Sequence, residues 1–418
     1  MGGRIFGLLI FIGFFILLEV YTYSGIRSLA AGHKWAKYFS YVFFAQIVVV
    51  ALALFNLFTG MQSGSMIKSA SMNLWLGIIL TSVVTKIVFC SLLLMQDGGR
   101  LLGGIFNFVQ AKVTNNQDQA FMPGRRQFFN QAALVAAGIP LVSMFYGMMV
   151  GKYRYTVKNV QLAFKDLPKA FDGFKIVQIS DIHSGSFDDK DAVKKGIDLI
   201  NAQQPDLLLF TGDLVNSEKD EINPYMDIFT ELTARYGKYA VTGNHDYYGY
   251  FGVPEAGKKA YWDDFMSKFK SMGFTMLNNE HQRIEKDGEN IVLAGVENWG
   301  AGRHFPKIGD LGKAIAGVQE NDFTVLMSHD PSHWDHHVLP NNKHVHLTLS
   351  GHTHGMQFGI DMPGFKWSPV KYRYPRWMGL YEEKGQYLYV NRGFGFLAFP
   401  GRVGMWPEIT VIELKTLA

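Results

Sequence analysis

Polar side chains that could bind metal ions gather in five short segments of the second half of the chain. Each segment directly follows an apolar run typical of a buried strand. The segments are Asp181-Ile182-His183, Gly212-Asp213, Gly243-Asn244-His245-Asp246, Ser328-His329 and Gly351-His352-Thr353-His354. Because the ligand crevice of an α/β sheet lies beyond the carboxyl ends of its strands, we expect these side chains to converge on one place.

Seven of these side chains offer the oxygen and nitrogen atoms that divalent metal ions prefer. They are Asp181, His183, Asp213, Asn244, His329, His352 and His354. The mixture of carboxylate, amide and imidazole suits Mn, Fe or Zn, and seven ligands are too many for one ion. Two ions that share a bridging carboxylate turn water into a hydroxide nucleophile and hold phosphoryl oxygens. The ligand set therefore predicts a site for two metal ions that suits hydrolytic chemistry.

The ordered set resembles the calcineurin-like metallophosphoesterase superfamily over roughly residues 155–415. In that superfamily the motifs run Asp-x-His, Gly-Asp, Gly-Asn-His-Asp/Glu, His and Gly-His-x-His. The resemblance implies a first metal held by Asp181, His183, Asp213 and His354, and a second held by Asp213, Asn244, His329 and His352, with Asp213 bridging. It implies that His245 is the catalytic histidine, where an imidazole can protonate the leaving alkoxide. Asp246 is expected to orient that ring, with a local turn contact as the alternative.

Segments near the C-terminus resemble the branch whose members carry membrane spans or a twin-arginine signal before the catalytic domain. These segments are Gly379-Leu380-Tyr381, Leu388-Tyr389-Val390-Asn391-Arg392-Gly393 and Pro407-Glu408-Ile409. Met356 departs from the branch, in which a second glycine more usually follows Gly355, and we expect it to affect substrate access. Arg392 is a candidate phosphate clamp or a partner in a structural ion pair.

Short β-rich runs alternate with amphipathic stretches after residue 151, which predicts an α/β layered domain. The predicted strands are residues 175–180, 206–211, 238–242, 291–296, 323–328, 345–350, 386–391 and 408–414, and the predicted helices are residues 188–203, 223–236 and 258–272. The predicted fold is a two-sheet metallophosphoesterase sandwich flanked by helices and preceded by four transmembrane α-helices. Its predicted domains are residues 1–152 and 153–418.

The first part of the chain has the composition of a membrane domain. Residues 1–150 contain three acidic and ten basic side chains, whereas the rest contain 33 acidic and 30 basic ones. Four apolar runs, residues 5–23, 38–58, 74–95 and 128–150, are each long enough to span a bilayer. For Glu19 and Lys86 inside these runs, snorkelling or a structural contact is favoured over a transport path. The nearly neutral second part excludes a nucleic-acid binder, because no basic stripe dominates it.

Basic residues between the runs predict the orientation in the membrane. The first loop carries Arg27, Lys34 and Lys37, the second Lys68, and the third Arg100, Lys112, Arg125 and Arg126. Because positive loops stay in the cytoplasm, everything after residue 150 is predicted to lie outside the cytoplasm. The membrane that the apolar runs span is predicted to be a bacterial-type cell membrane. Arg125-Arg126 before an apolar run also resembles a twin-arginine export signal, with a simple positive-inside anchor as the alternative.

The predicted function is a membrane-anchored two-metal phosphoesterase that hydrolyses phosphoester or pyrophosphate bonds of a lipid-linked or envelope substrate. The resemblance suggests a glycolipid precursor similar to UDP-2,3-diacylglucosamine, a normally cytoplasmic substrate that conflicts with the predicted orientation. A phosphoprotein phosphatase is an alternative, against which the four spans and the external domain argue. A non-catalytic metal-dependent sensor or scaffold would be favoured by a missing ligand, and all seven ligands are present. The sequence leaves the oligomeric state open.

Overall fold

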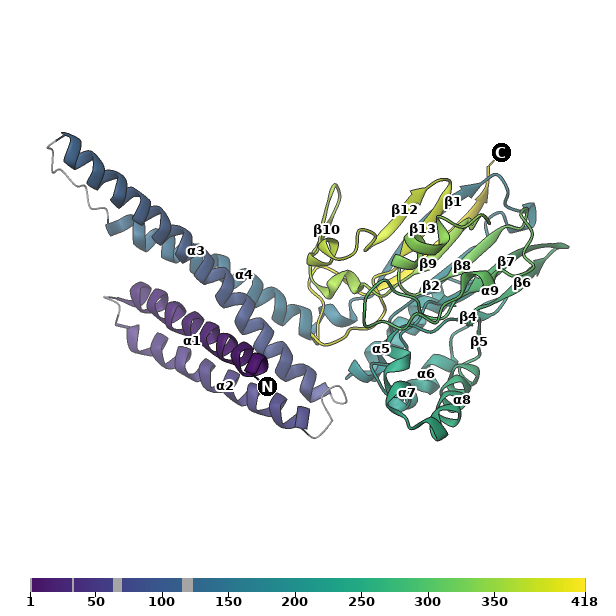
Figure 1. The fold of residues 1–418 in the computed structure, drawn as a ribbon, viewed down its shortest axis with the longest axis horizontal. Helices are drawn as coiled ribbons and strands as arrows, with labels where there is room; N and C mark the ends of the chain where they lie inside the picture. Colours follow the sequence, from purple (N-terminus) through teal and green to yellow (C-terminus); the bar gives the residue numbers. More distant parts are fainter. Residues whose placement is uncertain (1, 32–33, 63–69, 115–122, 418) are drawn as a thin grey trace. The chain divides into compact units, whose positions relative to one another are not determined.

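The computed structural model describes residues 2–31, 34–62, 70–114 and 123–417, and it divides the chain into two compact units. The N-terminal unit comprises residues 1–64 and 75–145, and the C-terminal unit comprises residues 65–74 and 146–418. Figure 1 shows the first as a group of long helices and the second as a layered α/β body. The division into residues 1–152 and 153–418 stays a prediction.

Long apolar helices build the N-terminal unit. They are α1 (Gly2–Ala30), α2 (Ala36–Gln62), α3 (Ala70–Thr114) and α4 (Pro123–Met149). Among the described residues, three stretches are long and apolar enough to cross a membrane, namely Ala36–Gly60, Met72–Gln110 and Phe128–Met149. The remaining predicted span, residues 5–23, lies within α1, and a total of four spans stays a prediction.

Helix α3 is longer than predicted. The predicted third span ends at residue 95, whereas the helix continues to Thr114, so Arg100 and Lys112 lie on a helix and not in a loop. No proline interrupts residues 96–114, so helical hydrogen bonding can continue through them despite their glycines. Lys68 and residues 115–122 of the predicted second and third loops lie outside the described residues.

Two pairs of polar side chains connect helices inside the N-terminal unit. Lys86 of α3 forms an ion pair with Glu19 of α1. The Nε2 atom of Gln46 in α2 donates a hydrogen bond to Oγ of Ser82 in α3 at 3.1 Å. Polar groups in hydrocarbon cost several kcal/mol when they have no partner. Glu19 and Lys86 therefore make the structural contact within the bundle that the sequence favours.

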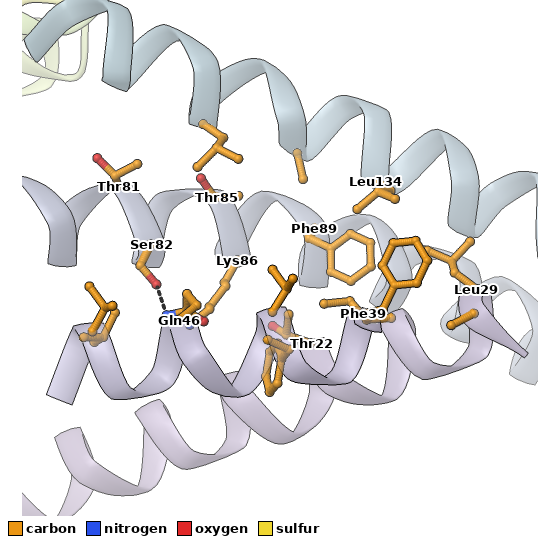
Figure 2. Close-up of a pocket in the computed structure, with 18 of the residues that line it drawn as sticks. Thr22, Leu29, Phe39, Gln46, Thr81, Ser82, Thr85, Lys86, Phe89 and Leu134 are labelled. Carbon is orange, nitrogen blue, oxygen red and sulfur yellow. Dashed lines mark hydrogen bonds between the residues drawn. The ribbon is translucent and has the colours of Figure 1, made fainter. Parts of the chain in front are cut away.

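A cavity of about 790 Å³ lies among these helices. In Figure 2, α3 supplies polar side chains to its wall, including Thr85 and Lys86, whereas Phe39 and Leu134 supply apolar ones. Most of the side chains that line the cavity are apolar and could not replace a lost polar partner. Lys86 thus joins α3 to α1 at a place where few other polar groups could pair with Glu19 if Lys86 were lost.

Replacing Lys86 by methionine leaves Glu19 without its cation, so the free energy of unfolding should fall by about 1–3 kcal/mol or more. The double variant Glu19→Gln/Lys86→Met removes both charges and should recover part of this loss. Thermal unfolding of the purified protein in detergent measures both effects. A single variant as stable as the parent protein would contradict a stabilising role of the ion pair.

Two six-stranded sheets face each other in the C-terminal unit (Figure 1). The first has the order β1 (Thr156–Phe164), β14 (Glu408–Thr416), β2 (Lys175–Ile179), β3 (Leu207–Phe210), β4 (Lys238–Ala240) and β5 (Phe274–Met276). The second has the order β12 (Gly379–Glu383), β13 (Gln386–Val390), β9 (Leu347–Ser350), β8 (Thr324–Met327), β7 (Glu289–Gly295) and β6 (Glu280–Lys286). Strands β2 to β5 are parallel to one another, as are β7, β8, β9 and β13. The predicted two-sheet sandwich is confirmed.

Successive side chains of the inner strands point alternately into two apolar cores, which explains why the sequence of each strand is a continuous apolar run. In β3, Leu207 and Leu209 enter the core between the sheets, whereas Leu208 and Phe210 enter the core on the outer face of the first sheet. Strands buried on both faces have no polar side to reveal their period.

Helices cover the outer faces of both sheets. Val193 of α5, Phe229 of α6 and Phe265 of α8 pack in the core of the first sheet's outer face, and Leu311 of α9 and Trp334 pack on the second sheet. The helices are α5 (Lys190–Ala202), α6 (Met226–Thr230), α7 (Tyr248–Gly252), α8 (Glu255–Ser271) and α9 (Leu311–Ala314). The predicted flanking helices are thus confirmed.

The predicted helix over residues 223–236 is confirmed only at Met226–Thr230, and its second half is wrong. A 3₁₀ segment, η4 (Lys219–Tyr225), leads into the five-residue α6, and the chain then leaves the helix. The amides of Arg235 and Tyr236 donate to the carbonyls of Pro205 and Asp206 instead. These bonds tie the segment to the start of β3, so tertiary contacts override the helical pattern.

Six strands were not predicted from the sequence. They are β1, β5, β6, β12 and the two strands of a separate hairpin, β10 (Ile360–Met362) and β11 (Phe365–Trp367). Most are short or lie at a sheet edge, where one-sided burial gives a weak apolar signal.

Candidate metal centre

The predicted ligands all lie just beyond the carboxyl ends of five parallel strands. Asp181 and His183 follow β2, Asp213 follows β3, and Asn244 follows β4. From the second sheet, His329 follows β8, and His352 and His354 follow β9. The sandwich therefore brings ligands from both sheets to one edge, as the strand order predicts.

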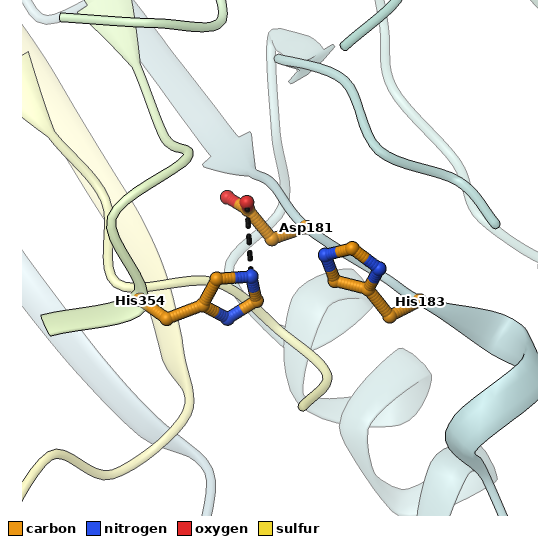
Figure 3. Close-up of side chains that lie close together, drawn as sticks. All are labelled: Asp181, His183 and His354. Carbon is orange, nitrogen blue, oxygen red and sulfur yellow. Dashed lines mark ion pairs between the residues drawn. The ribbon is translucent and has the colours of Figure 1, made fainter. Parts of the chain in front are cut away.

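One group of side chains consists of Asp181, His183 and His354, which are all buried and whose ligand atoms lie within 4.8 Å of one another. Figure 3 shows Asp181 and His183, from the loop after β2, converging with His354, from the loop after β9. Oδ1 of Asp181 lies 3.2 Å from Nε2 of His354. This arrangement could hold one metal ion.

A second group consists of Asp213, His329 and His352. Oδ2 of Asp213 lies 3.1 Å from Nε2 of His329, and Nδ1 of His352 lies 3.3 Å from the same nitrogen. Oδ1 of Asn244 approaches Nδ1 of His352 to 2.8 Å. All four predicted ligands of the second metal thus lie together.

Asp213 also lies beside the first group. Its Oδ2 atom is 3.5 Å from Nε2 of His183, and its carboxylate belongs to a further set with His183 and His245. One carboxylate therefore contacts imidazoles of both groups, which is the geometry that a bridging ligand needs.

Several predicted ligands have left-handed backbone conformations. The φ angles are 50° at Asp181, 48° at His183, 61° at Asp213, 71° at His352 and 51° at His354. This region costs roughly 1–2 kcal/mol for a residue with a Cβ, and aspartate enters it more readily than most. Strained backbone conformations of this kind cluster at functional sites, where the positions of the side chains matter most.

The glycines of two motifs allow close approach to the carboxylates. A Cβ at Gly351 would lie 2.3 Å from Oδ2 of Asp181, and one at Gly243 would lie 2.3 Å from Oδ1 of Asp213. Any side chain at either position would displace a predicted ligand.

Comparison with known proteins identifies both parts of the chain. Residues 4–152 match the family described as "Probable Calcineurin-like phosphoesterase, transmembrane domain", and residues 174–356 match "Calcineurin-like phosphoesterase". The "Uncharacterized metallophosphoesterase YkuE" of Bacillus subtilis is 31% identical over 298 residues, which are 70% of this chain and 98% of that protein. The chain belongs to the calcineurin-like metallophosphoesterase family.

Other relatives of this metallophosphoesterase also combine the two parts. A "Transmembrane protein with metallophosphoesterase domain" of Danio rerio is 29% identical over 69% of this chain and 63% of its own length. An "Uncharacterized metallophosphoesterase" of Helicobacter pylori is 25% identical over 97% of this chain and 98% of that protein. Family membership implies divalent metals, a phosphoester substrate and association with a membrane.

The second ring nitrogen of each cluster histidine has a partner. The oxygens of Asn216 and Tyr374 lie 3.1 Å from Nδ1 of His183 and 2.7 Å from Nε2 of His352. Such contacts fix which nitrogen faces a metal. The Thr211 carbonyl lies 2.8 Å from Nδ1 of His329 and fixes that ring in the same way. Nη2 of Arg402 lies 3.1 Å from Nδ1 of His354 and can only donate to it, so this contact does not favour the Nδ1–H form that metal binding through Nε2 requires.

Sequence reasoning missed these supporting residues. Asn216 lies three residues after Asp213, so its closeness to a motif could have identified it. Tyr374 and Arg402 lie far from every motif, and no spacing connects them with the site. Only the fold brings them to the histidines.

Asp246 supports the loops and does not orient the His245 ring. Its carboxylate accepts hydrogen bonds from the amides of Asp213, Leu214 and Gly243 at 3.1, 2.8 and 2.8 Å. Nδ1 of His245 instead lies 2.7 Å from the carbonyl of Asn216. The predicted ring contact is wrong, because three backbone amides occupy the carboxylate. Asp246 thereby joins the loops that follow β3 and β4.

Arg392 forms a structural ion pair and not a phosphate clamp. Its side chain is almost fully buried, and its guanidinium lies 2.6 Å from Glu408 and 3.0 Å from Asp361. Glu408 and Asp361 occupy Nε and Nη1, while Nη2 is buried and has no hydrogen-bond partner among the described residues. A guanidinium enclosed in this way is not open to a substrate phosphate.

Charges in the cluster are strongly coupled. Burial lowers the pKa of the His183 and His245 imidazoles, which favours the neutral rings. Although burial disfavours its cation, the adjacent Asp213 carboxylate raises the pKa of His329 to about 10. Burial and repulsion from Asp213 raise the pKa of Asp246 to about 7. Because a ligating imidazole must be neutral, binding of a cation at His329 would release a proton.

Proposed function

We propose that this protein is a membrane-anchored phosphoesterase that uses two divalent metal ions to hydrolyse phosphoester or pyrophosphate bonds. The observation that carries the proposal is the contact of Asp213 with imidazoles of both ligand groups. A carboxylate shared by two ligand groups is the arrangement that a two-metal hydrolytic site requires.

The donor set fits the metals. Nε2 of His183 is buried and has no hydrogen-bond partner among the described residues, while its Nδ1 atom is held by Asn216. An imidazole fixed in this way keeps a lone pair for a metal. Asp181, His183, Asp213 and His354 would hold one ion, and Asp213, Asn244, His329 and His352 the other. The ions, of which Mn, Fe and Zn are the best candidates, would supply Lewis acidity and the hydroxide nucleophile.

His245 is suited to protonate the leaving oxygen. Its Nδ1 atom donates to the carbonyl of Asn216, so Nε2 is the atom that can exchange a proton with substrate. The ring lies beside His183, with 4.8 Å between ring centroids. A leaving alkoxide next to the first ligand group would therefore meet this nitrogen, which can protonate it once the neutral ring has taken up a proton from solvent.

The substrate is proposed to be lipid-linked. The transmembrane family match and three apolar helices keep the C-terminal unit near a membrane, where lipid-borne phosphoesters are concentrated. A phosphodiester or pyrophosphate of an envelope lipid fits this placement best.

The C-terminal unit is proposed to lie outside the cytoplasm. The basic residues of predicted loops one and three outnumber those of loop two by seven to one. This excess favours a cytoplasmic location for loops one and three.

Asp213→Asn should lose both metals and lower hydrolysis by at least about a hundredfold, because an amide is a poor bridging ligand. Elemental analysis and turnover of an aryl phosphodiester measure the two effects. Asp335→Asn, which changes a carboxylate outside the ligand groups, should leave both unchanged. Two ions at full occupancy with normal turnover in Asp213→Asn would refute the two-metal assignment.

His245→Ala should retain both metals and slow turnover by about 10²–10⁴-fold, the usual effect of a positioned acid. Alkyl esters, which have poor leaving groups, should suffer more than activated aryl esters. The control His344→Ala removes an exposed imidazole at the opposite end of β9. Equal losses for both ester classes would exclude the role in leaving-group protonation.

A reporter enzyme that is active only after export should be active when fused after Ala418. Protease added to spheroplasts should then digest the C-terminal unit and spare residues 96–127. Activity of a cytoplasm-only reporter at the same position would reverse the orientation. It would also favour a cytoplasmic glycolipid precursor as substrate.

A further inference from the structure

The β10–β11 hairpin has one apolar face. Its register pairs Ile360 with Trp367 and Met362 with Phe365, and these four side chains share a face because cross-strand partners point the same way. Ile360, Met362 and Phe365 are 39%, 53% and 52% exposed. Figure 1 shows the hairpin projecting from the layered body. A soluble surface hairpin normally turns its apolar face inward.

The inward face of the hairpin is fixed by charge. Asp361 lies on this opposite face and accepts hydrogen bonds from Arg392 at 3.0 Å and from Lys158 at 3.3 Å. Arg392 is itself buried and paired with Glu408. Turning the hairpin over would break this buried network, so its apolar face is held outward.

Exposed apolar side chains are concentrated around the hairpin. Among the described residues 151–417, eleven large apolar side chains are exposed, and six of them lie between Met356 and Leu380. These six are Met356, Ile360, Met362, Phe365, Tyr372 and Leu380, and the other five are Leu199, Tyr248, Phe251, Ile308 and Leu417. A concentration of this kind marks a contact surface.

The same segment is rich in basic residues. Residues 355–380 contain Lys366, Lys371, Arg373 and Arg376 but a single acidic residue, Asp361. Arg376 pairs with Asp335 and Glu383, whereas Lys371 and Arg373 have no carboxylate partner in the part of the chain that the structure describes. Apolar side chains flanked by free cations are typical of a surface that binds anionic lipid headgroups.

Hydrogen bonds connect this segment with the loop of the metal-ligand candidates. Oγ of Ser368, directly after β11, donates to the carbonyl of Gly355 at 2.8 Å. Oγ1 of Thr353 donates to the carbonyl of Trp377 at 2.7 Å, and Tyr374 contacts His352. The loop that carries His352 and His354 is therefore fixed to the hairpin segment.

From these observations we infer that the hairpin face of Ile360, Met362 and Phe365 inserts into the headgroup region of a bilayer that contains anionic phospholipid. Lys371 and Arg373 contact the lipid phosphates. The inference deepens the proposed function, because it places the candidate site at the lipid surface and makes the substrate a phosphoester of a bilayer lipid. The lipid contact itself requires no hydrolysis.

The test places an environment-sensitive thiol label on the full-length protein in vesicles. Cys90 is buried, so Phe365→Cys supplies an accessible thiol on the hairpin face. Leu199→Cys supplies a matched control, because Leu199 is an exposed apolar residue of α5. The vesicles contain phosphatidylcholine with or without phosphatidylglycerol, and a fraction of the lipids carries a quencher on the acyl chain.

We expect the label at position 365 to be quenched by the lipid quencher and the label at position 199 to be unaffected. Phosphatidylglycerol should increase the quenching at position 365. In Phe365→Cys/Lys371→Gln/Arg373→Gln this increase should be lost. Equal quenching at both positions would overturn the inference. Protection of position 365 from a water-soluble quencher without lipid quenching would also overturn it, in favour of a protein partner.

Adding Asp213→Asn to Phe365→Cys separates this inference from the proposed function. The lipid quenching should persist when hydrolysis is lost. Normal hydrolysis of a soluble aryl phosphodiester without lipid quenching would reject the hairpin contact and leave the two-metal site standing. Lipid quenching in a Phe365→Cys protein, together with no hydrolysis by the parent protein, would reject the proposed hydrolytic site and leave the hairpin contact standing.

Discussion

Two buried carboxylates surrounded by imidazoles determine how the C-terminal unit must be built. Asp181 and Asp213 are almost completely excluded from solvent, and a buried carboxylate is tolerable only with hydrogen bonds or cations around it. Left-handed backbone at five of the ligand candidates adds to this cost. Loops that are both buried and strained keep their conformation when the surrounding structure holds them in place. A bound cation would in addition offset the negative charge of the two carboxylates. The parallel strands below the site provide such surroundings, because their ends leave the loops little freedom.

The carboxylates also connect loops, and Asp181 connects the two sheets. Asp181, after β2 of the first sheet, accepts the amide of His352 from the second sheet at 3.0 Å. Asp213 accepts the amide of His245 at 2.8 Å, and Asp246 accepts amides from the loops after β3 and β4. Each carboxylate thus satisfies backbone donors that would otherwise be buried without partners. Site geometry and sandwich stability therefore depend on the same hydrogen bonds, and a change at one carboxylate affects both.

Much of this arrangement could be predicted from the sequence, because parallel strands place their carboxyl ends together and the motif residues follow those ends directly. Arg402 and Tyr374 could not be predicted, since they reach His354 and His352 only through the fold. The sequence places Asp246 next to His245, but only the fold brings the amides of Asp213 and Leu214 from another loop to its carboxylate. The length of α3 was missed because its apolar signal weakens around glycines that interrupt the hydropathy and not the helix.

The two units distribute polar and apolar side chains in opposite ways, because apolar side chains are stable against hydrocarbon and polar ones against water. In the N-terminal unit the charged side chains Glu19 and Lys86 pair internally, while many apolar side chains are exposed, which is the stable arrangement in hydrocarbon. The C-terminal unit has an apolar core and polar surface except around β10 and β11, where the inner face is ionic and the outer face apolar. An apolar outer face over an ionic inner face is unfavourable in water and favourable at a lipid surface. An enzyme whose candidate site is fixed to such a surface could act on a lipid phosphoester without extracting its acyl chains from the bilayer. The hydrophobic free energy of those chains would then not oppose binding.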